Sequence, residues 1–163
     1  MDRYDQLQPA AIVASITSMQ RRWKDAMHVP VDKNIEDFFR VETDSGSIAE
    51  HIGAAIAQLQ ILHPALRTTS YNVPEPLEPN VAAAVANQGS GPWPSSAKDG
   101  LADLFNELDA IKSELEGINV RDWTKTTQAG STTLSLLAIA QGASRVAANR
   151  LAIVERLVRQ LAH

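Results

Sequence analysis

The chain has 163 residues, the size of one domain, and we expect a single domain over residues 1–163. Hydrophobic residues make up 44% and charged residues 21% of the sequence, which argues against a disordered or fibrous chain. The net charge of -4 disfavours the basic surface that a nucleic-acid-binding protein needs, so we expect no nucleic-acid partner.

The sequence has no cysteine, which excludes disulfides, thiolate metal ligands and a cysteine nucleophile. The first residues, MDRYDQLQPA, are acidic and polar, whereas a signal peptide begins with basic and then apolar residues. No apolar run approaches the roughly 20 residues of a membrane span. We therefore expect a cytoplasmic protein without a targeting segment or a membrane contact.

The first predicted helix covers about residues 9–27. Pro9 is favoured at a first helical position, because the N–H that it lacks would have no partner there. Apolar residues then recur at steps of three and four: Ile12, Ile16, Met19, Trp23 and Met27. This spacing places them on one face of a helix.

The second predicted helix begins after Ser47. Ser47 and Glu50 have the spacing of a capping box, in which each side chain accepts a hydrogen bond from the backbone N–H of the other residue. Pro64 is expected to stop or bend this helix, because its ring removes a donor and clashes with the preceding turn.

The stretch from Pro64 to Gly100 contains most of the prolines and is expected to be a long loop without strands. Only NVAAAVANQG within it is typical of a helix, with Asn80 as its N-cap and Gly89 as its end. Trp93 is expected to pin the loop to the body of the protein by burying its ring.

The last two predicted helices cover residues 96–116, ended by Gly117, and a segment from the cap Ser131 to about Ala162. No alternation with period two indicates a strand. The predicted fold class is all-α, an antiparallel four-helix bundle with a long Pro-rich loop and a short extra helix between helices two and three.

Three stretches resemble the DinB/YfiT-like family of four-helix bundles. GLADLFNELDAIKSELEGINVRDW and GSTTLSLLAIAQGASRVAANRLAIVERLV are similar to its third helix, the following connection and its last helix. SIAEHIGAAIAQL is similar to the opening of its second helix. The resemblance implies the same bundle, in a family that includes divalent-metal proteins and thiol-dependent transferases.

The resemblance also implies a place for the family's three metal-binding histidines, one on the second helix and a His-x-x-x-His pair on the last. The pair falls on Ala143 and Ala147, or on Val146 and Arg150 in a register shifted by three residues, and the third histidine falls near Ala54. None of these residues is a metal ligand, so we expect neither a metal nor a cofactor.

The residues themselves support the loss of the site. Residues 131–162 contain no histidine or aspartate, and Glu155, the one glutamate, is expected to point away from the apolar face. His51, one turn before Ala54, is the one substitute ligand that the second helix offers. A helix without donor side chains contributes nothing to a metal site.

Arg150 lies on the apolar face of the last helix, where a buried guanidinium must be paired. One interpretation is a structural ion pair with a carboxylate of the first or third helix, or a head group that reaches solvent at the bundle end. The other is an anchor for a small anionic ligand in a cavity beside Ala143 and Ala147. We prefer the structural pair, and close helix packing as the reason for the alanines.

We also expect particular surroundings for one histidine and for three arginines. His51, at the edge of the apolar face of the second helix, is expected to pair with a neighbouring polar group, or to join Arg150 at the ligand. Arg145, Arg156 and Arg159 are expected on an outward, solvated face of the last helix. No residue is assigned a catalytic role.

The sequence thus favours a non-catalytic binding or interaction protein that has lost the metal site. The alternative is a thiol-dependent transferase or isomerase that keeps the family cavity without a metal. A homodimer is a further expectation, because Leu134, Ile139 and Ile153 lie off the centre of the main apolar face.

Overall fold

The computed structural model describes residues 2–71 and 76–163, and these residues are mainly α-helical. The α-helices are α1 (Pro9–Ala26), α2 (Ile48–Ser70), α3 (Asn80–Val85), α4 (Ala97–Glu116) and α5 (Leu136–Ala162). Short 3₁₀ turns form η1 (Arg3–Gln6), η2 (Ile35–Asp37) and η3 (Val120–Asp122). Two antiparallel strands, β1 (Thr126–Ala129) and β2 (Thr132–Ser135), form a hairpin. The prediction of a mainly helical fold is confirmed.

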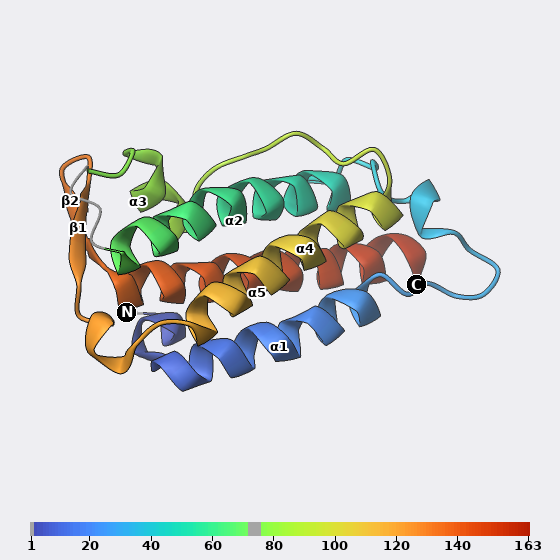
Figure 1. Cartoon of the computed structure of the whole chain (residues 1–163). Coiled ribbons are helices and arrows are strands. Elements are labelled where there is room, and N and C mark those ends of the chain that lie inside the picture. The colour runs from blue at the N-terminus through green and yellow to red at the C-terminus, as the bar shows by residue number, and fades with distance from the viewer. Residues whose placement is uncertain (1, 72–75) are drawn as a thin grey trace.

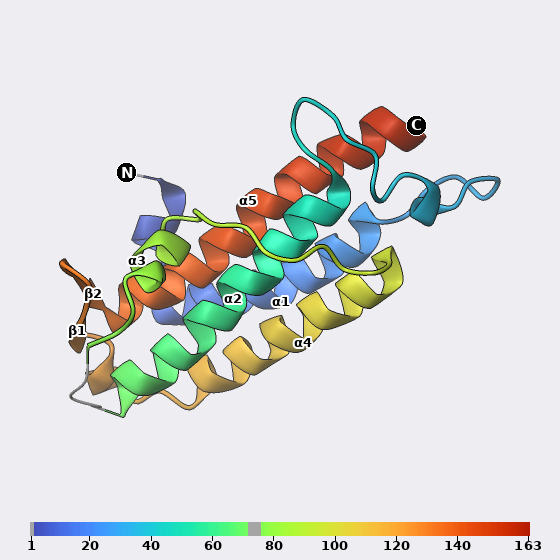
Figure 2. The same ribbon diagram turned by 90° about the horizontal axis from the view of Figure 1, so that it is seen from above.

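The four long helices lie side by side around one hydrophobic core (Figure 1). α4 and α5 each pack against both α1 and α2. α1 and α5 run in one direction along the fold, while α2 and α4 run in the other (Figure 1). The packed pairs α1–α5 and α2–α4 are therefore parallel, and the prediction that the helices are antiparallel holds only for α1–α4 and α2–α5. The long connection between α2 and α4 returns the chain to the end where α2 began, and residues 86–96 run back over α2 (Figure 2).

Local signals set the starts of α1, α2 and α4 as expected. Pro9 is the first residue of α1. In the capping box of α2, the Glu50 N–H donates to Ser47 Oγ at 3.0 Å and the Ser47 N–H donates to Glu50 Oε2 at 3.3 Å. Ser96 caps α4 by accepting from the Asp99 N–H at 3.0 Å. These bonds satisfy N–H groups that have no partner inside a helix.

Pro64 does not stop α2, because the helix continues to Ser70. That part of the prediction is wrong. Pro64 itself lies on the exposed side of the helix. The next two residues, Ala65 and Leu66, are buried in the core. Burial of this apolar face offsets the roughly 3 kcal/mol that a proline costs inside a helix.

The short helix α3 has different ends from those predicted. Pro79 occupies the N-cap position, and Asn80 is the first helical residue, so Asn80 does not cap α3. After Val85 the chain turns at Asn87, whose φ of 59° is left-handed, before it reaches Gly89. Asparagine accepts this conformation more readily than most residues, and it replaces the glycine that the sequence suggested.

The segment from residue 86 to residue 96 is fastened to the body of the protein. A Cβ added to Gly91 would lie 2.5 Å from the Cβ of Ala57, so the backbone there lies directly on α2. Arg40 donates to the Pro94 carbonyl at 2.7 Å, and its guanidinium lies 5.9 Å from the centre of the Trp93 ring. Trp93 remains 37% exposed, so it holds the segment by stacking against Arg40 more than by burial.

The β-hairpin before α5 was not expected and corrects the all-α prediction. The N-cap of α5 is Ser135, which accepts from the Ala138 N–H at 2.9 Å, whereas Ser131 lies in the hairpin turn. Gly130 supplies the left-handed residue of that turn, with φ of 62°. Each strand has four residues and buries few side chains, so the sequence shows no alternation of apolar and polar residues.

The middle of α5 is buried on every face, because every residue from 139 to 148 is buried. α1, α2, α3 and η1 lie against α5. Ala143 and Ala147 are fully buried. A Cβ added to Gly142 would lie 2.8 Å from the Cα of Val85 in α3. Close approach of the neighbouring elements therefore accounts for the small residues of this helix.

The apolar residues that suggested a homodimer pack against the core of the same chain. Ile139 is fully buried, Leu134 in β2 is buried, and Ile153 packs against the core. These residues therefore give no support to a dimer. Within the described residues, no helix combines the length and the hydropathy of a membrane span.

We predict that Gly142→Ala lowers the free energy of unfolding by about 1–3 kcal/mol, although alanine is the better helix former. The added methyl group would force α3 away from α5 at Val85. Chemical denaturation followed by circular dichroism measures the change. Gly117→Ala is the matched control, because a Cβ there meets only carbonyl oxygens at 3.6 and 3.7 Å. Equal stability of the two variants would contradict the prediction.

Candidate functional site

His51 of α2 and Arg150 of α5, which the sequence suggested as ligand contacts, lie together in the structure. Arg150 Nη1 and His51 Nδ1 are 3.0 Å apart. The other two suggested residues, Ala147 and Ala143, are fully buried about one and two turns before Arg150 in α5. The structure thus brings the two polar candidates, His51 and Arg150, into direct contact. The two alanines lie on the same helix as Arg150.

The polar partners of Arg150 are neutral. Its Nη2 donates to the Gly89 carbonyl at 3.1 Å, its Nη1 faces His51, and its Nε is buried with no hydrogen-bond partner in the described part of the chain. No carboxylate of the described residues forms an ion pair with it. The predicted ion pair with the first or third helix is therefore wrong.

The contact with Arg150 determines the tautomer of His51. Because the guanidinium can only donate, His51 Nδ1 must accept, and Nε2 then carries the proton. Nε2 lies 2.6 Å from the Ser45 carbonyl, which accepts that proton's hydrogen bond. Gly46 fixes this carbonyl in a tight turn with φ of 88°, where a Cβ would lie 2.2 Å from Glu50 Oε2. His51 is a satisfied, neutral side chain in this arrangement.

Arg150 carries a positive charge with little compensation. It is half-buried, and burial lowers the pKa of Arg150 from its ordinary value, while the negative charge of Glu50 raises it in part. Glu50 itself is engaged in the capping box with Ser47. A partly desolvated guanidinium without an ion-pair partner is a favourable contact point for an anion.

Near this contact, Gln58 of α2 is a buried amide without partners. Its side chain is 1% exposed, and neither Nε2 nor Oε1 has a hydrogen-bond partner among the described residues. A Cβ placed on Gly89 would lie 3.8 Å from Gln58 Nε2. The sequence analysis did not identify Gln58. Its position on the apolar face of the second helix could have indicated a buried polar side chain.

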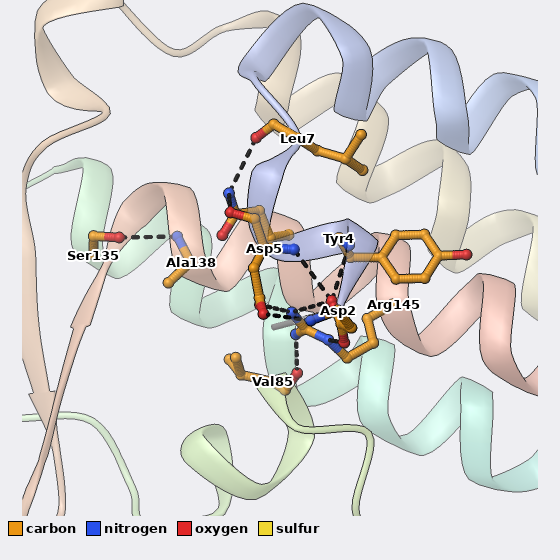
Figure 3. A network of polar contacts seen from close by, with 9 residues as sticks. Asp2, Tyr4, Asp5, Leu7, Val85, Ser135, Ala138 and Arg145 are labelled. Carbon is orange, nitrogen blue, oxygen red and sulfur yellow. Dashed lines mark hydrogen bonds and ion pairs between the residues drawn. The ribbon is translucent and has the colours of Figure 1, made fainter.

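Arg145 also departs from the prediction of an outward, solvated side chain. It is buried, with 8% of its surface exposed, and its guanidinium lies between the N-terminal turn and α3 (Figure 3). Nε donates to Asp2 Oδ2 at 2.7 Å, Nη2 donates to Asp5, and Nη1 donates to the Val85 carbonyl at 2.5 Å. Arg145 is therefore the arginine of α5 that forms the structural ion pair.

The N-terminal turn is further tied to α5 by Gln141. Its Nε2 donates to the carbonyls of Asp5 and Leu7 at 3.1 and 3.0 Å. Asp2 and Asp5 also cap each other's backbone, with Asp2 N donating to Asp5 Oδ2 at 3.0 Å. In the sequence this turn was visible only as two aspartates three residues apart.

The described residues contain no group of three histidine or acidic side chains placed to hold a metal ion. The three positions that the family resemblance assigns to histidines, Ala54, Ala143 and Ala147, are buried in the core. Comparison of the chain with protein-family models, with curated proteins and with solved structures finds no match. The chemistry of the site therefore has to be argued from its own residues.

We predict that the ion pair of Asp2 makes stability depend on pH at acid values. The hydrogen bond from the Arg145 side chain lowers the pKa of Asp2 from its ordinary value of 3.8, and desolvation opposes this. The stabilisation is therefore present above about pH 4 and is lost as the pH falls through the lowered pKa.

Asp2→Asn tests this prediction. Because the Asp2 side chain is 45% exposed, we expect a loss of no more than about 1 kcal/mol at pH 7. The stability difference between the variant and the original protein should shrink as the pH falls below about 4. Denaturation curves over a pH series measure it, and a difference that grows at acid pH would contradict the role of Asp2.

We predict opposite effects for the two arginines of α5. Arg145→Met should lower the free energy of unfolding by about 1–3 kcal/mol, because it removes the charge-assisted hydrogen bonds to Asp2, Asp5 and the Val85 carbonyl. Arg150→Met should leave stability within about 0.5 kcal/mol or raise it, because it removes a desolvated charge without an ion pair. Denaturant titration of both variants provides the comparison. A large loss for Arg150→Met alone would reverse our assignment.

Proposed function

We propose that this chain is a metal-free, non-catalytic binding protein with a DinB/YfiT-like four-helix bundle, and that it holds a small anionic ligand at Arg150 and His51. The resemblance of the three sequence stretches supports the bundle, as does the packing of α4 and α5 against both α1 and α2. The cytoplasm remains the expected location. The proposal concerns a site between α2 and α5.

The observation that supports ligand binding most directly is the environment of Arg150. Its side chain is half-buried, its Nε has no partner in the described residues, and its remaining contacts are to His51 and the Gly89 carbonyl. An anion that approaches Nε and Nη2 would replace one carbonyl contact by two charge-assisted hydrogen bonds. The gain in such contacts favours binding of a carboxylate or a phosphate.

The same surroundings argue against catalysis by the described site. His51 is neutral, and both ring nitrogens are engaged, Nδ1 by Arg150 and Nε2 by the Ser45 carbonyl. Glu50 is occupied by the backbone of Ser47. No nucleophile with an adjacent base is formed by these residues, so they can hold a ligand and do little chemistry on it.

We predict that acetate or inorganic phosphate binds at Arg150 and raises the melting temperature. Arg150→Gln should weaken binding by tenfold or more, because a charge-assisted hydrogen bond contributes about 1.5–3 kcal/mol. Calorimetric titration at constant ionic strength measures the affinity. Arg156→Gln is the control, since Arg156 is an exposed arginine of the same helix.

Two outcomes would contradict the proposal. Equal weakening by Arg150→Gln and Arg156→Gln would mean that the anions bind through general surface charge. Stoichiometric zinc, nickel or manganese in the purified protein after incubation with these ions, measured by elemental analysis, would contradict a metal-free site. Turnover of a low-molecular-weight thiol would favour the transferase alternative.

A further inference from the structure

Gln58 is a polar side chain for which the core supplies no partner. It lies seven residues after His51 on α2, and residues at this spacing share one face of a helix. Both amide atoms are buried and unpaired within the described residues. An unpaired buried donor or acceptor is strongly unfavourable, and most such groups in native proteins have a partner. A bound molecule would supply the missing partner.

Gly89 links Gln58 to Arg150. Its carbonyl accepts from Arg150 Nη2 at 3.1 Å, while a Cβ built on it would lie 3.7 Å from Gln58 Cγ. The backbone at Gly89 therefore covers both side chains. Asn87, two residues earlier, also has a buried Oδ1 without a partner among the described residues. Unpaired polar atoms thus occur in this segment, at Asn87, and on two side chains next to Gly89, those of Gln58 and Arg150.

Gly89 lies between contacts that hold this segment on both sides. Gly91 is fixed by its close approach to Ala57, and Arg40 holds the Pro94 carbonyl. Before Gly89, the Gln88 N–H donates to the Ala83 carbonyl of α3 at 2.8 Å, and at Gly89 itself the carbonyl accepts from Arg150. An anion that binds Arg150 competes with this bond. Displacement of Gly89 would uncover Gln58.

We infer that the ligand carries, besides its anionic group, a carboxamide that pairs with Gln58. This inference rests on the proposed function, because it assigns the second end of the ligand held by Arg150. An amide offers a donor and an acceptor side by side, and another carboxamide complements both. A second carboxylate would accept from Gln58 Nε2 but would face the lone pairs of Oε1. The half-amide of a small dicarboxylic acid therefore fits better than the diacid.

The test compares succinamate with butyrate, which has the same chain length and the same carboxylate but no amide, and with succinate. In calorimetric titrations we expect the original protein to bind succinamate about tenfold more tightly than either other acid, as two further hydrogen bonds predict. Gln58→Met should reduce the preference over butyrate to less than about threefold. Gln60→Met is the control, because Gln60 is an exposed glutamine of α2.

The outcomes separate the inference from the function on which it rests. Binding of succinamate and butyrate with equal affinity, abolished by Arg150→Gln, would overturn the role of Gln58 and leave the anion site in place. Binding of none of the three acids would overturn both. The ratio of affinities in the original protein decides the question even if Gln58→Met does not fold, and circular dichroism of the variant reports its folding.

Discussion

Burial of the middle of α5 on all its faces is the constraint on which the rest of the structure depends. A helix that is surrounded on every side can approach its neighbours closely only through small side chains. Residues 139–148 are all buried, and Gly142 lies where α3 leaves no space for a Cβ. Polar side chains that must remain in this stretch or at its ends then need partners from the elements that cover them.

Arg145, inside this stretch, and Arg150, just after it, meet that need differently. Arg145 binds the carboxylates of Asp2 and Asp5, so the N-terminal turn serves to neutralise a buried charge as well as to cover α5. Arg150 has only His51 and a backbone carbonyl. One arginine is therefore part of the framework, while the other has no ion pair among the described residues and is the arginine for which we propose anion binding.

The connection between α2 and α4 covers the side chains of the proposed anion site. It returns the chain along the fold, and it places the backbone at Gly89 over both Arg150 and Gln58 (Figure 2). A long loop inside a small domain commonly serves function. Here the segment is held by α3 before Gly89 and by Ala57 after it, so binding at the proposed site would require a displacement at Gly89.

The sequence by itself determined the elements that local contacts decide. The capping box of Ser47 and Glu50 and the helix starts at Pro9 and Ser96 depend on residues only a few positions apart. Apolar periodicity located the four long helices for the same reason. The hairpin escaped this reasoning, because strands of four residues that bury few side chains carry no periodic signal.

Only the tertiary structure decided which arginine is buried and paired. A helical periodicity gives the angle of Arg145 and Arg150 relative to the apolar face, but it does not say which element covers each side of the helix. Asp2 and Asp5, the partners of Arg145, are 143 and 140 residues away in the sequence. The energy of a charge depends on such distant neighbours and on the water that they exclude, and these exist only once the chain has folded.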